Sequence, residues 1–176
     1  MKMVEALRKL QAQSIKGRYV YTTGDLARLF AEPRRTPRLN ASLGRLVAEG
    51  VLSRPTRGVY VYAENPGPEV LHHIVEAMRK GATNVESFET ALSKWGLISQ
   101  SYPRLLTVAT TGREATVKTE WGTIELVHTA MAPTDLLAAS VSRDGMLPLA
   151  DEETSLLMAR RASRKALELV EEEDDR

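Results

Sequence analysis

A helix with a marked beginning and end, followed at once by a hairpin, constrains this chain more than any other feature. Thr36 can cap the helix with its hydroxyl, and Pro37 suits the first helical turn because the N–H that proline lacks has no intrahelical acceptor there. Apolar side chains then recur at helical spacing, and Gly50 is placed to end the helix. The apolar stripe consists of Leu39, Leu43, Leu46 and Val47. This segment therefore predicts a helix with one buried face.

The residues after Gly50 predict a two-stranded hairpin over residues 51–62, with its turn at residues 55–58. The β-prone run 19–21 can pair with this hairpin, and a further helix begins after Thr22 or Thr23. Two helices joined by a short turn, with a basic hairpin directly behind them, are typical of a winged helix-turn-helix.

Charge is divided unequally along the chain, although the whole carries a formal charge of only +1. Residues 1–62 contain twelve Lys and Arg against four Asp and Glu, whereas residues 63–176 contain twelve against nineteen. Neutralisation of phosphates supplies most of the non-specific affinity for DNA, so the basic part is expected to bind a duplex. We therefore predict a winged helix-turn-helix DNA-binding domain over residues 1–64.

The candidate DNA contacts lie at the start of the basic helix, on its outer face and on the hairpin. The helix is expected to enter the major groove, and the hairpin arginines to reach phosphates or an adjacent minor groove. Asn40 has the side chain to read adenine, but its angle lies nearer the buried stripe, so it ranks below Arg38 and Arg45. The full set is Arg34, Arg35, Thr36, Arg38, Asn40, Ser42, Arg45, Arg54 and Arg57.

The run Asn65-Pro66-Gly67-Pro68 indicates a linker where the charge changes sign, so a second domain is expected over residues 69–176. Helical spacing and then alternation of apolar residues predict its elements. These are helices at 69–80, 85–95, 136–141 and 151–170, and strands at 105–110, 115–120 and 123–129. The strands are expected to be antiparallel because their connections are short. The predicted fold class is α+β: a winged helix-turn-helix followed by a mixed α/β domain with a small antiparallel sheet.

The sequence offers little for catalysis. It contains no cysteine, no glycine-rich phosphate loop and no nucleophile elbow. His72 and His73 are adjacent, so on a helix they point about 100° apart and do not chelate one metal unaided. We expect no enzyme activity, no catalytic residue, no cofactor and no metal. Because no apolar run approaches the length that crosses a bilayer, we also expect a cytoplasmic protein without membrane contact.

With these residues set out, the chain resembles the AbiEi family of antitoxin transcriptional regulators from bacterial type IV toxin–antitoxin systems. In the first domain the resemblance rests on the runs 21–27, 43–52 and 57–60. In the second domain it rests on an Ala-Leu helix that ends in Gly-Leu, a Val-Ala-Thr strand and a Gly-x-Ile-Glu strand, at 87–98, 107–110 and 121–125.

The resemblance implies an antitoxin that represses its own operon by binding operator inverted repeats, with two copies on double-stranded DNA. It also implies that the second domain opposes a nucleotidyltransferase-type toxin, an opposition that need not involve a stable complex. The alternative is a winged-helix transcriptional regulator whose second domain senses a ligand or a protein and which has no toxin partner. A third hypothesis, from a different class, is an enzyme tethered to DNA.

Overall fold

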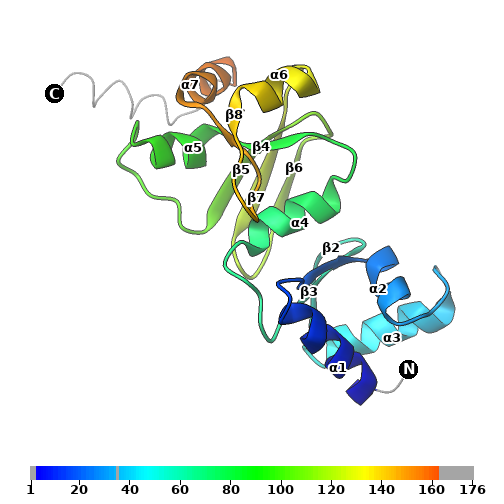
Figure 1. Cartoon of the computed structure of the whole chain (residues 1–176). Coiled ribbons are helices and arrows are strands. Elements are labelled where there is room, and N and C mark those ends of the chain that lie inside the picture. The colour runs from blue at the N-terminus through cyan, green and yellow to red at the C-terminus, as the bar shows by residue number, and fades with distance from the viewer. Residues whose placement is uncertain (1–2, 35, 163–176) are drawn as a thin grey trace. The chain divides into compact units, whose positions relative to one another are not determined.

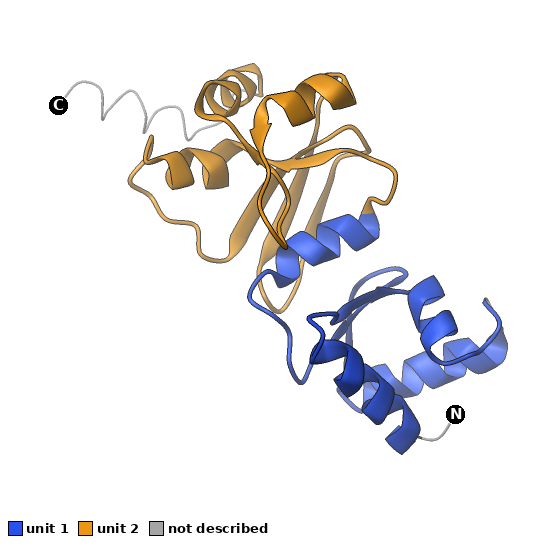
Figure 2. Ribbon diagram, viewed as in Figure 1, with its two compact units in different colours: residues 1–78 blue, residues 79–176 orange. Residues whose placement is uncertain are grey.

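The computed structural model describes residues 3–34 and 36–162, and the chain divides into two compact units (Figures 1 and 2). Unit 1 spans residues 1–78 and unit 2 spans residues 79–176. Both units contain helices and strands, so the predicted α+β class is confirmed at this level. No helix in the described part of the chain is both long and apolar enough to cross a bilayer.

Unit 1 builds a small antiparallel sheet beside its helices. Its elements are α1 (Met3–Ser14), β1 (Val20–Thr22), α2 (Thr23–Leu29), α3 (Pro37–Ala48), β2 (Leu52–Thr56), β3 (Val59–Tyr62) and α4 (Val70–Met78). The strand order is β1-β3-β2, with Tyr21 opposite Tyr60. The predicted pairing of the run 19–21 with the hairpin is therefore confirmed. The tyrosines of these strands and Tyr19 are buried and fill the core, because they offer large apolar area inside a small unit.

Both helix beginnings are capped as the sequence predicts. Thr22 and Asp25 form a capping box at α2, and the Thr36 hydroxyl accepts a hydrogen bond from the Leu39 amide at 3.2 Å at the start of α3. Leu39 and two further leucines of α3 are buried, whereas Val47 is half-buried. The predicted cap, first-turn proline and leucine stripe of α3 are confirmed.

The hairpin turn is shorter than predicted. It occupies Arg57 and Gly58, and Pro55 lies within β2 instead of in the turn. The pairing register shifts between Ser53 and Thr56, which accommodates Pro55 because proline has no N–H to donate to the ladder. Gly58 has φ +81, a left-handed conformation that glycine adopts without steric cost.

Helix α4 belongs to unit 1, although the sequence indicated a boundary at residues 65–68 and a second domain from 69 to 176. The helix packs on β1 and β3, with Ile74 and Val75 buried. The ring of His73 meets the ring of Tyr19 edge-on, at 5.4 Å between centroids. The proline- and glycine-rich run is therefore a loop inside unit 1, and the compact units divide after Met78 because α4 returns to the first sheet.

Unit 2 is built on a mixed sheet with the strand order β6-β7-β5-β4-β9-β8. Its elements are β4 (Asn84–Glu86), α5 (Phe88–Trp95), β5 (Leu105–Thr110), β6 (Ala115–Lys118), β7 (Thr123–His128), α6 (Pro133–Ala138), β8 (Ser140–Val141), β9 (Leu149–Ala150) and α7 (Glu152–Arg161). The prediction of a small antiparallel sheet is wrong, because β5 runs parallel to β7 and β4 runs parallel to β9. Strand β6 runs antiparallel to β7 and brings the chain back to the edge of the sheet at which β5 starts. Strand β7 then lies between β6 and β5 and runs in the same direction as β5.

Two predicted helices of unit 2 are partly strands. Val85, expected on a helix, lies in β4, and the segment 136–141 is divided between α6 and β8. Helices α5 and α7 pack together over a core that includes Val85, Leu92 and Met158. The described helix α7 ends at Arg161, and residues 163–170 of the predicted helix lie outside the described residues.

Candidate nucleic-acid interface

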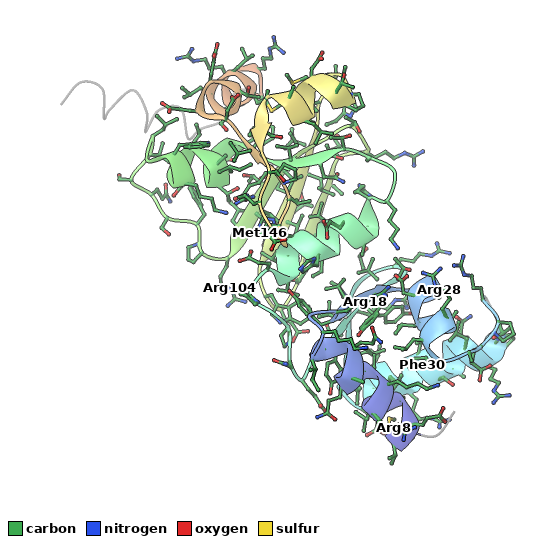
Figure 3. The ribbon with its side chains drawn as sticks, in the orientation of Figure 1. Arg8, Arg18, Arg28, Phe30, Arg104 and Met146 are labelled. Atoms are coloured by element: carbon green, nitrogen blue, oxygen red, sulfur yellow. The ribbon has the colours of Figure 1, made fainter. Side chains whose placement is uncertain are left out.

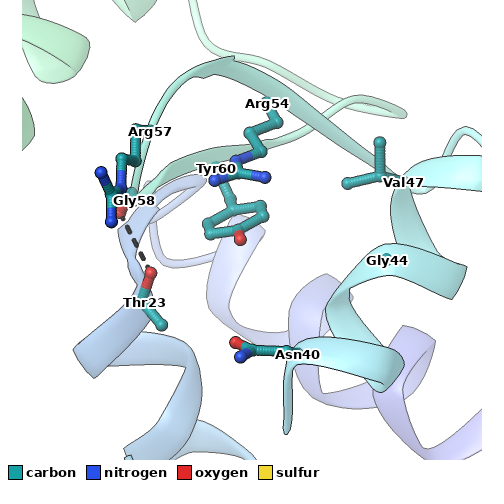
Figure 4. Close-up of a pocket in the computed structure, with 8 residues that line it drawn as sticks. All are labelled: Thr23, Asn40, Gly44, Val47, Arg54, Arg57, Gly58 and Tyr60. Atoms are coloured by element: carbon teal, nitrogen blue, oxygen red, sulfur yellow. Dashed lines mark hydrogen bonds between the residues drawn. The ribbon is translucent and has the colours of Figure 1, made fainter. Parts of the chain in front are cut away.

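Two adjoining hollows open on unit 1. The first, of ≈ 450 Å³, lies between α3 and the hairpin, and Figure 4 shows Asn40 on its helix side and two arginines on its hairpin side. It is lined by Thr23, Asn40, Gly44, Val47, Arg54, Arg57, Gly58 and Tyr60. The second, of ≈ 620 Å³, is lined by Thr23, Gly24, Arg34 and Arg57. Because the hollows share Thr23 and Arg57, we treat them together and call these ten residues the basic groove.

Helix α3 presents one face to the basic groove. Asn40, Gly44 and Val47 are four and three residues apart, so they lie along one side of the helix. This side borders the buried leucine stripe, yet Asn40 is exposed. The sequence-based ranking of Asn40 below Arg38 and Arg45 is therefore not supported by its position, since Asn40 faces the hairpin arginines and the other two line neither hollow.

The hairpin tip is tied to the start of α2. The Thr23 amide donates a hydrogen bond to the Gly58 carbonyl oxygen at 3.0 Å, and the Thr23 hydroxyl donates to the same oxygen at 3.5 Å (Figure 4). This anchor holds the backbone beside Arg57 in place. Further along the hairpin, the Arg54 guanidinium lies 5.7 Å from the centre of the Tyr60 ring, a cation–π contact that orients the arginine over a buried ring.

Arg34 reaches the basic groove because Gly24 has no side chain. A Cβ at Gly24 would lie 3.1 Å from the Arg34 Cζ atom, closer than ordinary van der Waals contact. The guanidinium of Arg34 can therefore rest against the first turn of α2, in the hollow that Arg57 also lines. Among residues 3–34 and 36–162, no ion pair involves Arg34, Arg54 or Arg57. Their positive charges are not neutralised within the described chain.

The remaining candidates are placed less favourably. Arg38 forms an ion pair with Glu32 at 3.0 Å, in which the arginine side chain is 71% exposed and the glutamate side chain 12% exposed, so its charge already has a partner. Arg45 is exposed on the outer face of α3, and Ser42 is half-buried. The hydroxyl of Thr36 caps α3 and donates to the Pro33 carbonyl oxygen at 3.2 Å, so its first role is structural. Arg35 lies outside the described residues.

Two other cations of unit 1, labelled in Figure 3, share a single carboxylate. Arg18 and Arg28 both pair with the buried carboxylate of Asp25, which also accepts hydrogen bonds from the Thr22 amide and hydroxyl. One carboxylate balances only one of the two guanidinium charges, and neither arginine lines the hollows of the basic groove. Arg28 lies three positions after Asp25 on the same helix, so this pair follows from helical spacing, whereas Arg18 lies seven positions before Asp25 and meets it only through the fold.

Sequence reasoning missed the uncharged half of the basic groove. Thr23, Gly24, Gly44 and Tyr60 line it beside the arginines. The spacing of Gly44 from Asn40 is a detectable signal, since a glycine one helical turn from an exposed amide leaves room for a partner to approach. A Cβ at Gly44 would meet nothing within 4 Å.

Comparison with known proteins gives one result about the fold. No family model matches the chain, and no curated protein matches it. Among solved structures, the crystal structure of the RV2827C protein from Mycobacterium tuberculosis is similar, with a TM-score of 0.64 and 16% sequence identity over 93% of this chain. The present chain covers 63% of the length of that one. At this identity the likeness shows a shared α+β fold alone.

Proposed function

We propose that residues 1–64 form a winged helix-turn-helix that binds duplex DNA through the basic groove. In this proposal α2 and α3 are the two helices of the motif, and the hairpin of β2 and β3 is the wing. The observation that carries it is the convergence of Arg34, Arg54 and Arg57. These three arginines come from a loop, a strand and a turn, and they open on adjoining hollows without an acidic partner in the described chain.

The chemistry of the basic groove suits a phosphate backbone beside a base edge. Guanidinium groups bind phosphate oxygens through paired N–H donors, and such contacts fix the register of a protein on a duplex. The Asn40 amide carries one acceptor and two donors, the set that pairs with the N6 and N7 atoms of adenine in the major groove. We assign the arginines to phosphates and Asn40 to base reading, with Arg38 and Arg45 as outer phosphate contacts.

The biological role that we propose follows the resemblance to AbiEi antitoxins. The chain would repress its own operon from operator inverted repeats, as two copies on the DNA, and residues 79–176 would oppose a nucleotidyltransferase-type toxin in the cytoplasm. Residues 79–176 carry sixteen Asp and Glu against twelve Lys and Arg, which supports this division, because a negative domain avoids the DNA that the basic one binds. The alternative remains a regulator without a toxin, whose second unit senses a ligand or a protein.

Base reading by Asn40 provides the experiment. Fluorescence anisotropy with duplexes from the chain's own upstream region would identify a binding site, which is then varied one base pair at a time. We expect Asn40→Ala to lose discrimination at one A·T pair by about 1–3 kcal/mol, while affinity for unrelated duplexes stays nearly unchanged. Gln11→Ala, which removes an exposed amide from α1, is the matched control.

Two results would reject the assignment. If Asn40→Ala weakens binding equally for every duplex, the amide does not read a base. If the wild-type chain prefers single-stranded to duplex DNA, the winged-helix proposal fails. Co-expression with the neighbouring gene then separates the two biological roles, since only an antitoxin restores growth.

A further inference from the structure

A third hollow lies wholly within unit 2 and has no part in the proposed DNA binding. Its volume is ≈ 410 Å³, within the range of pockets that hold small organic molecules. Its apolar lining includes Phe88, Val127, Met131 and Met158, and its polar lining consists of His128, Thr129 and Arg161. It is therefore a mainly apolar pocket with one arginine, formed where β7, α5 and α7 meet.

The backbone at Phe88 is strained, and the strain is held by hydrogen bonds on both sides. Phe88 has φ +57, a left-handed conformation that is sterically unfavourable for a bulky residue. The Thr107 hydroxyl donates to the Ser87 carbonyl oxygen at 2.5 Å, and the Thr90 amide donates to the Thr107 hydroxyl oxygen at 3.1 Å. The residues before and after Phe88 are thus fixed to β5, and the Phe88 side chain is fixed on the wall of the pocket.

Soft, polarisable groups make up the rest of the apolar wall. Met158 is buried, Met131 is half-buried, and methionine sulfur makes favourable contacts with aromatic rings. An aromatic ring of a ligand fits against the two methionine side chains and the Phe88 ring better than a strongly hydrated polar group does. The two methionines and the phenylalanine give up no hydrogen bond to water when the ligand displaces it.

The polar groups of the pocket favour an anion. Arg161 lies at the end of α7, is exposed and takes part in no ion pair among residues 3–34 and 36–162. The Thr129 hydroxyl accepts a hydrogen bond from the Met131 amide at 3.2 Å, which leaves its own hydrogen to donate. A guanidinium and a hydroxyl donor together match a carboxylate.

We propose that this pocket binds a small aromatic monocarboxylic acid. The aromatic body lies against Phe88, Met131 and Met158, and the carboxylate pairs with Arg161. This site would make unit 2 a ligand-binding unit whether or not unit 1 binds DNA.

The test uses the full-length protein and 4-phenylbutyrate as the probe, with isothermal titration calorimetry and thermal unfolding as readouts. We expect saturable binding and a raised melting temperature for the acid, a weaker effect of the neutral 4-phenylbutan-1-ol, and no effect of acetate. Arg161→Gln should weaken binding of the acid about tenfold or more, since a hydrogen bond to a charged group contributes about 1.5–3 kcal/mol. Arg160→Gln, which removes the neighbouring exposed cation of α7 that does not line the pocket, should leave the affinity unchanged.

Filling the pocket gives an independent variant. Ala130→Trp places a large ring in the hollow and should abolish binding, with circular dichroism to check that the fold is kept. If this variant does not fold, the comparison of Arg161→Gln with Arg160→Gln decides. Absence of saturable binding to the wild-type chain would overturn the proposal, as would equal affinities of the two arginine variants or binding that survives in folded Ala130→Trp.

Discussion

Replacing Glu86 by glutamine should destabilise unit 2 by roughly 3 kcal/mol, at the lower end of the range for breaking a buried ion pair. Glu86 lies in β4 with 1% of its surface exposed. Its carboxylate accepts hydrogen bonds from the Lys94 ammonium at 2.9 Å and from the Arg143 guanidinium at 2.6 Å. Glutamine keeps an acceptor but loses the charge, so the two cations would be left without their counter-charge. The lower end applies because the Lys94 side chain is 44% exposed and can turn to water.

The loss should spread beyond β4. Arg143 also donates to the Leu147 carbonyl oxygen, so the carboxylate of Glu86 fixes the segment between β8 and β9 as well as α5. Both tryptophans, Trp95 and Trp121, belong to unit 2, so urea unfolding followed by tryptophan fluorescence reports on this unit. Glu153→Gln, which removes an exposed carboxylate from the first turn of α7, is the control and should cost about 0.5 kcal/mol. Equal losses for the two variants would refute the reasoning.

Acid should act through the same carboxylate. Burial raises the pKa of the Glu86 carboxyl group, whereas the hydrogen bonds from Lys94 and Arg143 lower it. The lowering is the larger effect, so the pKa lies below its ordinary value of 4.5. The unfolded chain therefore takes up this proton at a higher pH than the folded chain does. The contribution of Glu86 is complete above pH 4.5 and is lost as the pH falls through its folded pKa. Glu86→Gln should flatten the decline of stability below pH 4.5, and an unchanged decline would contradict this account.

Two further predictions concern unit 1. Gly58→Val should lower the stability of this unit by about 1–3 kcal/mol, because valine is strained at φ +81; circular dichroism at increasing temperature measures the loss, and an unchanged melting curve would argue against a left-handed turn. Gly67→Ala should loosen the packing of α4, because a Cβ at this position would lie 2.4 Å from the Tyr19 ring. We expect faster hydrogen exchange of the α4 amides in this variant. The control is Gly44→Ala, whose Cβ meets nothing within 4 Å and which should leave the exchange of these amides unchanged.

Local features of this chain could be predicted from sequence because they depend on neighbours. The cap at Thr36, the proline after it and the leucine stripe lie within one helix, so spacing alone was sufficient. Parallel pairing of β5 with β7 was missed because it depends on where β6 lies in the sheet, which the length of a connection does not determine. The boundary between the two units lies after Met78 instead of at residues 65–68 for a similar reason. A loop rich in proline and glycine has the same sequence pattern whether the next helix leaves the unit or packs back onto Tyr19.

The candidate site was predicted in its residue types but not in its grouping. Arg54 and Arg57 follow from the hairpin, and their place in one groove with Arg34 depends on the close approach of that side chain to Gly24. The place of Asn40 in the lining of the groove was not predicted, because a helical wheel gives an angle relative to the buried stripe but does not show where the hairpin lies. Long-range contacts therefore decided which arginines share a surface.

The salt dependence of duplex binding tests the central proposal most directly. In a titration of the full chain, replacing Arg34, Arg54 and Arg57 by glutamine should reduce the slope of log K against log salt by about 2.7, since each lost phosphate contact removes about 0.9. The control replaces three cations of α1 and the turn after it, which do not line the basic groove: Arg8, Lys9 and Lys16. We predict that this control keeps nearly the wild-type slope. Equal slopes for the two triple variants would contradict the assignment of DNA binding to the basic groove.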